Sequence, residues 1–244
     1  MKEDVLGGLG VRIAGGDDRE GGGEGPALVL LHGYGAPGTD LVPLWRQVEV
    51  PASLRFVFPE APLTVDLGFP GMSGRAWWHL DVMALQERLA RGPDSALAAA
   101  SEIPAGLDEA REAVLRLLDE LSERYRVAPE RVVLGGFSQG AMVACDAALR
   151  SRRPLAGLVL LSAAPVALTE WRRTAPLRAG LSVLQSHGRA DPILPFAGAE
   201  LLRDALTEAG LSVEFLAFNG GHGIPAGATT ALGPFLARTL GETA

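Results

Sequence analysis

Short apolar runs recur along the chain and alternate with segments in which apolar residues return every three or four positions. The short runs are typical of strands buried on both faces of a sheet, and the longer segments are typical of amphipathic helices. The predicted strands are residues 27–31, 54–58, 131–134, 155–161, 181–185 and 211–218. The predicted helices are residues 40–48, one or two within 83–101 broken at 92–93, 105–125, one after Ser138, 196–209 and a last one interrupted or started at Gly233-Pro234. This alternation predicts an α/β fold with a mainly parallel sheet flanked by helices on both faces.

Two segments lack a clear pattern. Residues 1–26 are predicted to be an irregular N-terminal segment, in which residues 11–14 can add a short edge strand. Residues 62–81 are rich in Gly and Pro, and a loop of this length inside a compact domain is usually functional, so they are predicted to form an active-site loop. Trp77 and Trp78 lie in this loop and are the candidate substrate-binding side chains. No repeat or linker divides the 244 residues, which predicts one domain.

The most informative stretch is Gly136-Phe137-Ser138-Gln139-Gly140, between a predicted strand and a predicted helix. This is the Gly-x-Ser-x-Gly pattern in the structural context that supports it. A serine on so sharp a turn has a strained backbone, and the positions two before and two after it must be small. The turn exposes the hydroxyl above a helix N-terminus, which favours developing negative charge. Ser138 is therefore the predicted nucleophile.

The predicted base is a histidine, because a serine hydroxyl is a weak nucleophile at neutral pH. The chain has four histidines. When a Gly-x-Ser-x-Gly turn follows a parallel strand, the chain order is nucleophile, acid, histidine, which disfavours His32 and His79. No acid at a strand end lies between Ser138 and His187. His222 follows the last predicted strand and is flanked by glycines, so it is the predicted general base.

The predicted acid is Asp191, on the loop after the strand at 181–185. Its role is to orient the imidazole and to stabilise the imidazolium. Pro192 and Pro195 stiffen this loop. Other acidic residues lie on presumed helices or within a strand: Glu170, Asp204 and Glu214.

Two backbone N–H groups are predicted to bind the oxyanion. The turn at Ser138 supplies the N–H of Gln139, and the loop after the first buried strand supplies that of Tyr34. His32 is expected to brace this second loop by hydrogen bonds rather than to contact substrate.

Composition and charge restrict the partners. A net charge of −7 argues against nucleic acid. No apolar run approaches the roughly 20 residues that span a bilayer, and the first residues lack a secretory signal pattern, so we expect a cytoplasmic protein without stable membrane insertion, as a monomer or homodimer. The one cysteine, Cys145, allows no disulfide within the chain and is expected to be a small buried hydrophobe. No His/Cys cluster or phosphate-binding fingerprint is present, so neither a metal nor a cofactor is expected.

Four motifs in order resemble those of the phospholipase/carboxylesterase family, which includes bacterial carboxylesterases and acyl-protein thioesterases. They are His32-Gly33-Tyr34-Gly35, Gly136-Phe137-Ser138-Gln139-Gly140, Gly188-Arg189-Ala190-Asp191-Pro192 and Gly220-Gly221-His222. The resemblance implies an α/β-hydrolase fold without a large lid domain, metal or cofactor. It also implies Ser138, Asp191 and His222 as the triad, with Tyr34 and Gln139 as oxyanion donors.

The resemblance favours a serine carboxylesterase that hydrolyses short- to medium-chain esters, a small-molecule substrate class. The thioesterase branch has Leu where Tyr34 stands and Gly where Ala141 stands. An acyl-protein thioesterase or lysophospholipase acting on long chains is the alternative. A binding protein on the same fold and a serine peptidase remain as other readings, which ester turnover and an ester-versus-amide assay separate.

Overall fold

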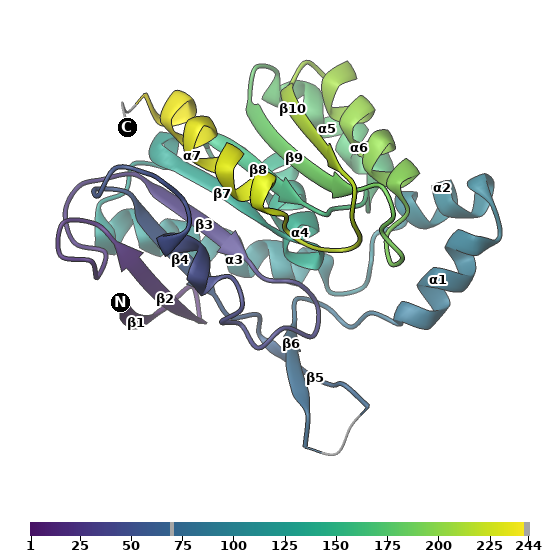
Figure 1. Ribbon diagram of the computed structural model, residues 1–244, viewed down its shortest axis with the longest axis horizontal. Coiled ribbons are helices and arrows are strands. Elements are labelled where there is room, and N and C mark those ends of the chain that lie inside the picture. The colour runs from purple at the N-terminus through teal and green to yellow at the C-terminus, as the bar shows by residue number, and fades with distance from the viewer. Residues whose placement is uncertain (69–70, 242–244) are drawn as a thin grey trace.

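The computed structural model describes residues 1–68 and 71–241 and is built around an eight-stranded sheet (Figure 1). The strand order is β1-β2-β4-β3-β7-β8-β9-β10. Strands β4 to β10 of this sheet run parallel, and β1 and β2 are antiparallel to their neighbours. The strands are β1 (Lys2–Leu6), β2 (Leu9–Gly15), β3 (Ala27–Leu31), β4 (Arg55–Pro59), β7 (Val132–Phe137), β8 (Gly157–Leu161), β9 (Ser182–Gly188) and β10 (Ser212–Phe218).

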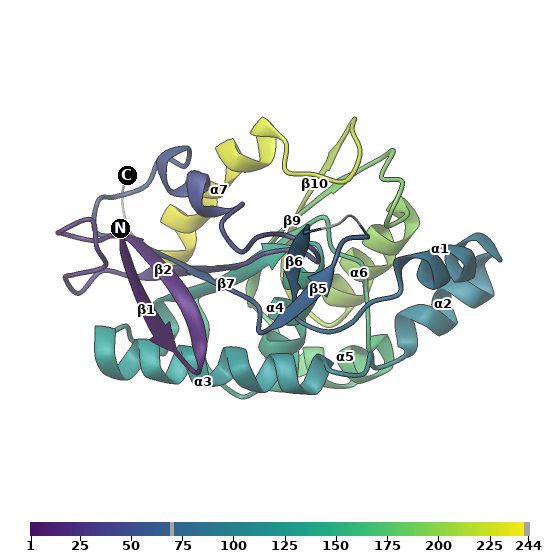
Figure 2. The same ribbon diagram turned by 90° about the horizontal axis from the view of Figure 1, so that it is seen from below.

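Helices cover both faces of this sheet, as predicted (Figure 2). One face packs against α3 (Leu107–Tyr125), α4 (Gln139–Arg150), α5 (Leu168–Thr174) and α6 (Phe196–Glu208). The other face packs against the 3-10 turn η1 (Val42–Arg46) and α7 (Ala226–Leu240). The remaining helical elements are α1 (Val82–Ala90), α2 (Pro93–Ser101), η2 (Pro129–Arg131) and η3 (Ala175–Arg178).

Apolar periodicity accounts for the main elements. Every residue of β3 and of β8 is buried, because helices cover both faces of these strands. On α3 the buried side chains return every three or four residues. These side chains are Leu107, Ala110, Ala113, Val114, Leu117, Leu118 and Leu121.

The strand order reverses between β3 and β7, which is where the site forms. From β3 the chain first adds β4 on one side and later adds β7 on the other. At such a switch point the loops after the two strands separate and leave a crevice at the carboxyl ends. The loop that begins at His32 and the turn that carries Ser138 face each other across it.

Two segments predicted to be irregular form hairpins instead. Within residues 1–26, β1 and β2 pair around Gly7-Gly8, whose positive φ values of 60° and 82° suit a two-residue hairpin turn. Residues 11–14 belong to β2, which is an inner strand, and β1 forms the edge. Within residues 62–81, β5 (Leu63–Asp66) pairs with β6 (Ser73–Ala76), and this hairpin projects from the body (Figure 1).

The final helix also differs from the prediction, because α7 continues through Pro234. Its neighbours Leu232, Phe235 and Leu236 are buried between α7 and the sheet, and this packing outweighs the hydrogen bond that proline removes. The predicted helix at 40–48 is reduced to η1. The predicted break at residues 92–93 is confirmed, since it separates α1 from α2.

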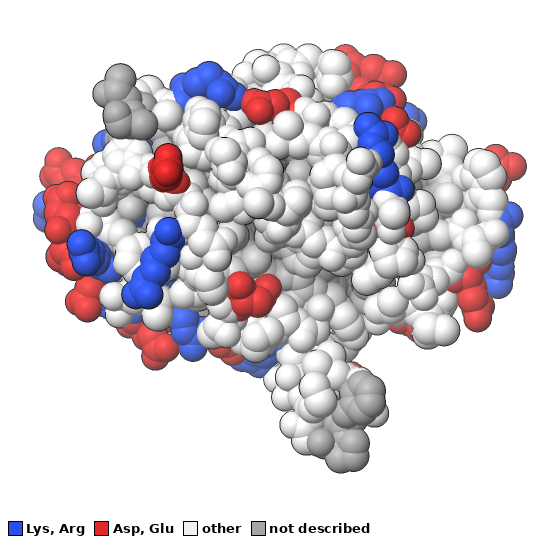
Figure 3. Space-filling view, in the orientation of Figure 1, with Lys and Arg blue, Asp and Glu red and all other residues white. Residues whose placement is uncertain are grey.

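Two further observations concern partners. In residues 1–68 and 71–241, no helix is long and apolar enough to cross a membrane. The face seen in Figure 3 carries Lys, Arg, Asp and Glu interspersed around its edge and mainly uncharged residues across the middle.

Cys145 lies in the core on α4, and burial raises the pKa of its thiol well above the usual value.

Candidate active site

Ser138 occupies a strained turn between β7 and α4. Its φ of 53° and ψ of −120° lie outside the regions that L-residues normally adopt. A hydrogen bond ties the turn to β8, since the Ser138 N–H donates to the Leu161 carbonyl at 2.8 Å. A Cβ at Gly140 would collide with the carbonyls of Leu31 and His32, so this position requires glycine. The turn therefore presents the hydroxyl at the carboxyl end of the sheet.

A continuous hydrogen-bonded chain joins the three residues predicted to form a triad. Ser138 Oγ lies 2.9 Å from His222 Nε2, and His222 Nδ1 lies 2.7 Å from Asp191 Oδ2. The Asp191 side chain is fully buried, and that of His222 is 12% exposed. An ionised carboxylate only accepts, so the neutral imidazole carries its proton on Nδ1 and leaves Nε2 to accept from Ser138. This arrangement can remove the hydroxyl proton.

The loop of Asp191 folds around its own carboxylate. Asp191 Oδ1 accepts from the N–H groups of Ile193 and Leu194, both at 2.9 Å. Oδ2 is thus directed at His222. The same loop is tied to the loop of His222, because the Ala190 N–H donates to the Gly220 carbonyl at 3.0 Å.

His187 is a supporting residue that the sequence reasoning set aside. Its side chain is fully buried, with Nε2 2.9 Å from the Leu194 carbonyl and 3.3 Å from Asp191 Oδ2. Both partners are acceptors, which places the proton on Nε2. Burial lowers the pKa of His187, so the ring is neutral near pH 7. The sequence feature that could have indicated this role is the position of His187, a polar residue at the end of β9.

Ser162 supports the His222 loop from β8. Its hydroxyl donates to the Gly223 carbonyl at 3.0 Å, and its backbone has a φ of 51°. The ring of Phe137 lies against the imidazole of His222, with centroids 4.9 Å apart. Phe137 at the end of β7 and Ser162 directly after β8 therefore restrict the position of His222.

His32 braces the loop after β3. Its Nε2 accepts from the Ala61 N–H at 2.9 Å, and Nδ1 donates to the Gly33 carbonyl at 2.8 Å. Burial lowers the pKa of His32, which keeps this neutral form. A Cβ at Gly33 would lie 3.3 Å from Ser138 Cβ, so the loop directly adjoins the turn.

The two backbone groups predicted to bind an oxyanion belong to residues next to Gly33 and Ser138, which lie against each other. Tyr34 follows Gly33, and Gln139 is the first residue of α4. Within the part of the chain that the structure describes, neither N–H has a hydrogen-bond partner. Unused N–H groups at a helix start and at the facing loop can bind negative charge.

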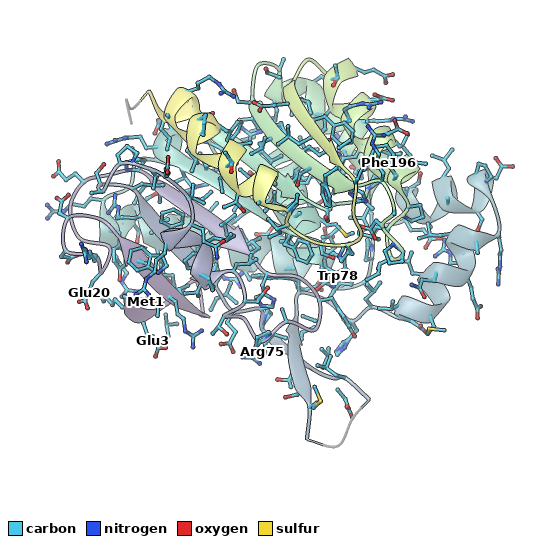
Figure 4. The ribbon with its side chains drawn as sticks, viewed as in Figure 1. Met1, Glu3, Glu20, Arg75, Trp78 and Phe196 are labelled. Atoms are coloured by element: carbon cyan, nitrogen blue, oxygen red, sulfur yellow. The ribbon has the colours of Figure 1, made fainter. Side chains whose placement is uncertain are left out.

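The Gln139 side chain connects the turn to the two tryptophans. Its Oε1 accepts from the Trp77 N–H and its Nε2 donates to the Trp78 carbonyl, both at 2.9 Å. The Trp77 indole is buried in the core and donates to the His32 carbonyl at 2.9 Å. Trp77 therefore braces the site, whereas Trp78 lies at the carboxyl end of the sheet and faces a cavity (Figure 4).

This cavity has a volume of about 620 Å³, which is in the range of small-molecule sites. Its wall comes from parts of residues 78–104, from Met142, from residues 164–166 and from residues 194–201. Of the described residues in the predicted loop at 62–81, only Trp78, Leu80 and Asp81 contribute, because β5 and β6 pair with each other away from the body. The described ranges contain no group of three or more His, Cys, Asp or Glu side chains placed to hold a metal ion.

The fold and the site together define a serine hydrolase of the α/β-hydrolase class. Residues 20–240 match the family model described as Phospholipase/Carboxylesterase. The chain belongs to the phospholipase/carboxylesterase family.

Individual relatives agree with this membership. The acyl-protein thioesterase 1 of Mycosarcoma maydis is 31% identical over 178 residues, which cover 69% of this chain and 70% of that protein. The acyl-protein thioesterase 1 of Neurospora crassa is 26% identical over 227 residues, covering 89% of this chain and 88% of that protein. The crystal structure of esterase PE8 has a TM-score of 0.73 and 29% identity, covering 94% of this chain and all (100%) of that chain.

Proposed function

We propose that this protein is a carboxylesterase that hydrolyses short- to medium-chain carboxylic esters through an acyl-enzyme. The observation that carries the proposal is the hydrogen-bonded chain from Ser138 Oγ through His222 to Asp191, at distances of 2.9 and 2.7 Å. Such a chain on a strained turn is what activates a serine hydroxyl for attack.

Acylation begins when Ser138 Oγ attacks the ester carbonyl carbon while its proton passes to His222 Nε2. The carbonyl oxygen becomes an oxyanion, stabilised by the N–H groups of Tyr34 and Gln139. Asp191 stabilises the imidazolium. As the tetrahedral intermediate collapses, the ester C–O bond breaks and His222 gives its proton to the departing alkoxide.

Deacylation repeats these steps with water in place of the serine. His222 Nε2 takes a proton from water while the water oxygen attacks the carbonyl carbon of the acyl-enzyme. Collapse releases the carboxylic acid, and His222 returns the proton to Ser138 Oγ. No cofactor, metal or redox step enters this balance.

The nucleophile is tested with Ser138→Ala and an active-site fluorophosphonate. Because triad residues act as a unit, kcat should fall by about 10⁴- to 10⁶-fold. In the wild type, mass spectrometry should find the label on one serine. In Ser138→Ala this label should be absent. Ser212→Ala, a change at an exposed serine on β10, is the matched control and should keep both properties. Full labelling of Ser138→Ala would contradict the assignment.

A long-chain acyl thioesterase is the second candidate. The names of the fungal relatives and the size of the apolar cavity favour it. Esters and thioesters of octanoic and palmitic acid, compared at equal chain length, separate the two functions. Higher kcat/KM for the palmitoyl thioester than for the octanoyl ester would replace our proposal.

We also propose a cytoplasmic location. The single thiol of Cys145 is buried and cannot form a disulfide within the chain, which suits a reducing compartment. Fractionation of cells that express the protein tests this directly.

A further inference from the structure

The end of β9 brings a second histidine against the acid of the triad. The side chains of His187 and Asp191 are both fully buried, and His187 Nε2 lies 3.3 Å from Asp191 Oδ2. This is the same oxygen that His222 Nδ1 contacts at 2.7 Å. Two imidazole rings therefore share one carboxylate oxygen, and His222 is the one that also contacts Ser138.

Three residues form a closed circuit of contacts around this carboxylate. Asp191 Oδ1 accepts from the Leu194 N–H at 2.9 Å, and the Leu194 carbonyl accepts from His187 Nε2 at 2.9 Å. The contact between His187 Nε2 and Asp191 Oδ2 completes the circuit. Because both oxygens are held, the carboxylate cannot rotate about its Cβ–Cγ bond without breaking one of these contacts.

The ring of His187 is itself held in place and uncharged. The ring of Phe196, at the start of α6, lies beside it with centroids 6.2 Å apart. Burial lowers the pKa of His187, so this ring stays neutral near pH 7 while His222 gains a proton during the reaction. A neutral His187 presents an N–H group to Asp191 without adding a positive charge that would compete with the His222 imidazolium.

We propose that His187 is a positioning residue of the triad, which acts through Asp191 by fixing the direction of its carboxylate toward His222. This inference rests on the proposed esterase function. A displacement of about 1 Å in the groups behind a reacting atom can lower the rate by about 100-fold. Because His187 acts on the base and not on the bound substrate, its loss should lower kcat and leave KM nearly unchanged.

Strand β9 offers a matched control for the test. Gln185 lies two residues before His187 on the same face of β9, is fully buried, and donates from Nε2 to the Ala199 carbonyl at 2.8 Å. Its hydrogen bond goes to α6 rather than to the loop of Asp191. His187→Leu and Gln185→Leu should therefore both lower thermal stability. Only His187→Leu should lower kcat for p-nitrophenyl acetate, by about 10- to 100-fold at an unchanged KM.

Two further variants separate positioning from packing. His187→Gln places an amide donor where Nε2 stands and should recover most of the kcat that His187→Leu loses. In Asp191→Asn an NH₂ group replaces Oδ2, so His187 no longer faces an acceptor that it could direct. Adding His187→Leu to Asp191→Asn should therefore lower kcat by less than about threefold further, because residues that act through one another are not additive.

The rate constant for fluorophosphonate labelling of Ser138 repeats this comparison without an ester substrate. A rate constant, unlike a final yield, does not depend on the fraction of the protein that folds. Labelling about 10- to 100-fold slower in His187→Leu, but near the wild-type rate in Gln185→Leu, supports the positioning role, even if the wild type hydrolyses no ester and the proposed function fails.

Three results would overturn the positioning role and leave the triad assignment standing. They are an unchanged rate in His187→Leu, an equal loss in Gln185→Leu, and a loss from His187→Leu that is as large in Asp191→Asn as in the wild type. A wild-type chain that takes up no label would contradict the triad and the positioning role together.

Discussion

The two carboxylate oxygens of Asp191 accept hydrogen bonds from different parts of the molecule. Oδ1 accepts from two N–H groups of its own loop, and Oδ2 accepts from His222. The loop therefore fixes which oxygen faces the imidazole. His187 adds to this by holding the Leu194 carbonyl and lying 3.3 Å from Oδ2.

Asp191→Asn should reverse the polarity of this contact. The amide oxygen keeps the two loop N–H bonds, so the NH₂ group faces His222 Nδ1 and forces the proton onto Nε2. That tautomer cannot accept the proton of Ser138, so kcat should fall by about 10²- to 10⁴-fold with little change in thermal stability. Ester kinetics and a thermal melt check this. An unchanged rate would assign the acid to another carboxylate.

For single residues, the sequence indicated where candidate site residues lie in the chain better than it indicated which side chains contact each other. Ser138, Asp191 and His222 could be predicted because each follows a strand and because their order in the chain is restricted. The contacts of His187 with Leu194 and of the Gln139 side chain with Trp77 depend on how two loops fold against each other. Nothing in the spacing of these residues encodes that geometry.

The turn between β7 and α4 is the element on which the site depends most. Gly140 packs directly on the backbone after β3, where Leu31 and His32 present their carbonyls. The turn and the loop of Tyr34 are therefore in backbone contact without a side chain between them. A change of one methyl group at this contact should move the N–H groups of both Tyr34 and Gln139.

Gly140→Ala should cost both stability and activity. Overpacking of this kind costs about 1–3 kcal/mol, and separation of the loop from the turn should lower kcat/KM at least about 100-fold. Gly227→Ala is the matched control, since a Cβ at this position in α7 meets nothing within 4 Å. The control should be as stable as the wild type or more stable by about 0.4–1 kcal/mol. Urea unfolding and ester kinetics measure both variants, and a fully active Gly140→Ala would contradict the packing argument.

Among the elements, buried parallel strands were predicted well and hairpins poorly. The strands β3, β7 and β8 are covered on both faces, so their sequences carry no polar side chain. The hairpins β1–β2 and β5–β6 are partly exposed, and their signals are the turn residues, such as Gly7-Gly8, rather than an apolar run. In α7, tertiary packing overrode the local preference of Pro234.

Two buried histidines make the stability of the whole molecule sensitive to acid. Burial lowers the pKa of both His32 and His187 in the folded state. Unfolded histidine has a pKa near 6.5, so just below this pH the unfolded chain binds more protons. The free energy of unfolding therefore falls as the pH drops below about 6.5 and levels off above it.

His187→Gln should make this dependence shallower. The amide can still donate to the Leu194 carbonyl but does not titrate, so the slope between pH 5 and 6.5 should decrease by up to about 1.4 kcal/mol per pH unit. Urea unfolding at half-unit pH intervals gives both slopes. The variant can be less stable at pH 7 and still show the shallower slope, whereas a slope equal to that of the wild type would rule out His187 as a source.

The general architecture was predictable, but the shape of the cavity was not. An α/β sheet with the site at its carboxyl edge follows from alternating strands and helices. The cavity depends on a space that α1 and α2 leave unfilled. An apolar pattern predicts which side chains are buried, but it does not predict where packed elements leave a space. The wall consequently comes largely from α1, α2 and the body rather than mainly from the predicted loop at 62–81.

The burial of Cys145 also has a practical consequence for labelling. The chain has no other thiol, and this one is enclosed in the core with a raised pKa, so maleimide dyes have no accessible target. Ala98→Cys would then provide a single reactive thiol on the exposed side of α2. A fluorophore attached there can report movement of α1 and α2 while a fluorophosphonate occupies Ser138, because the two reagents modify different chemical groups.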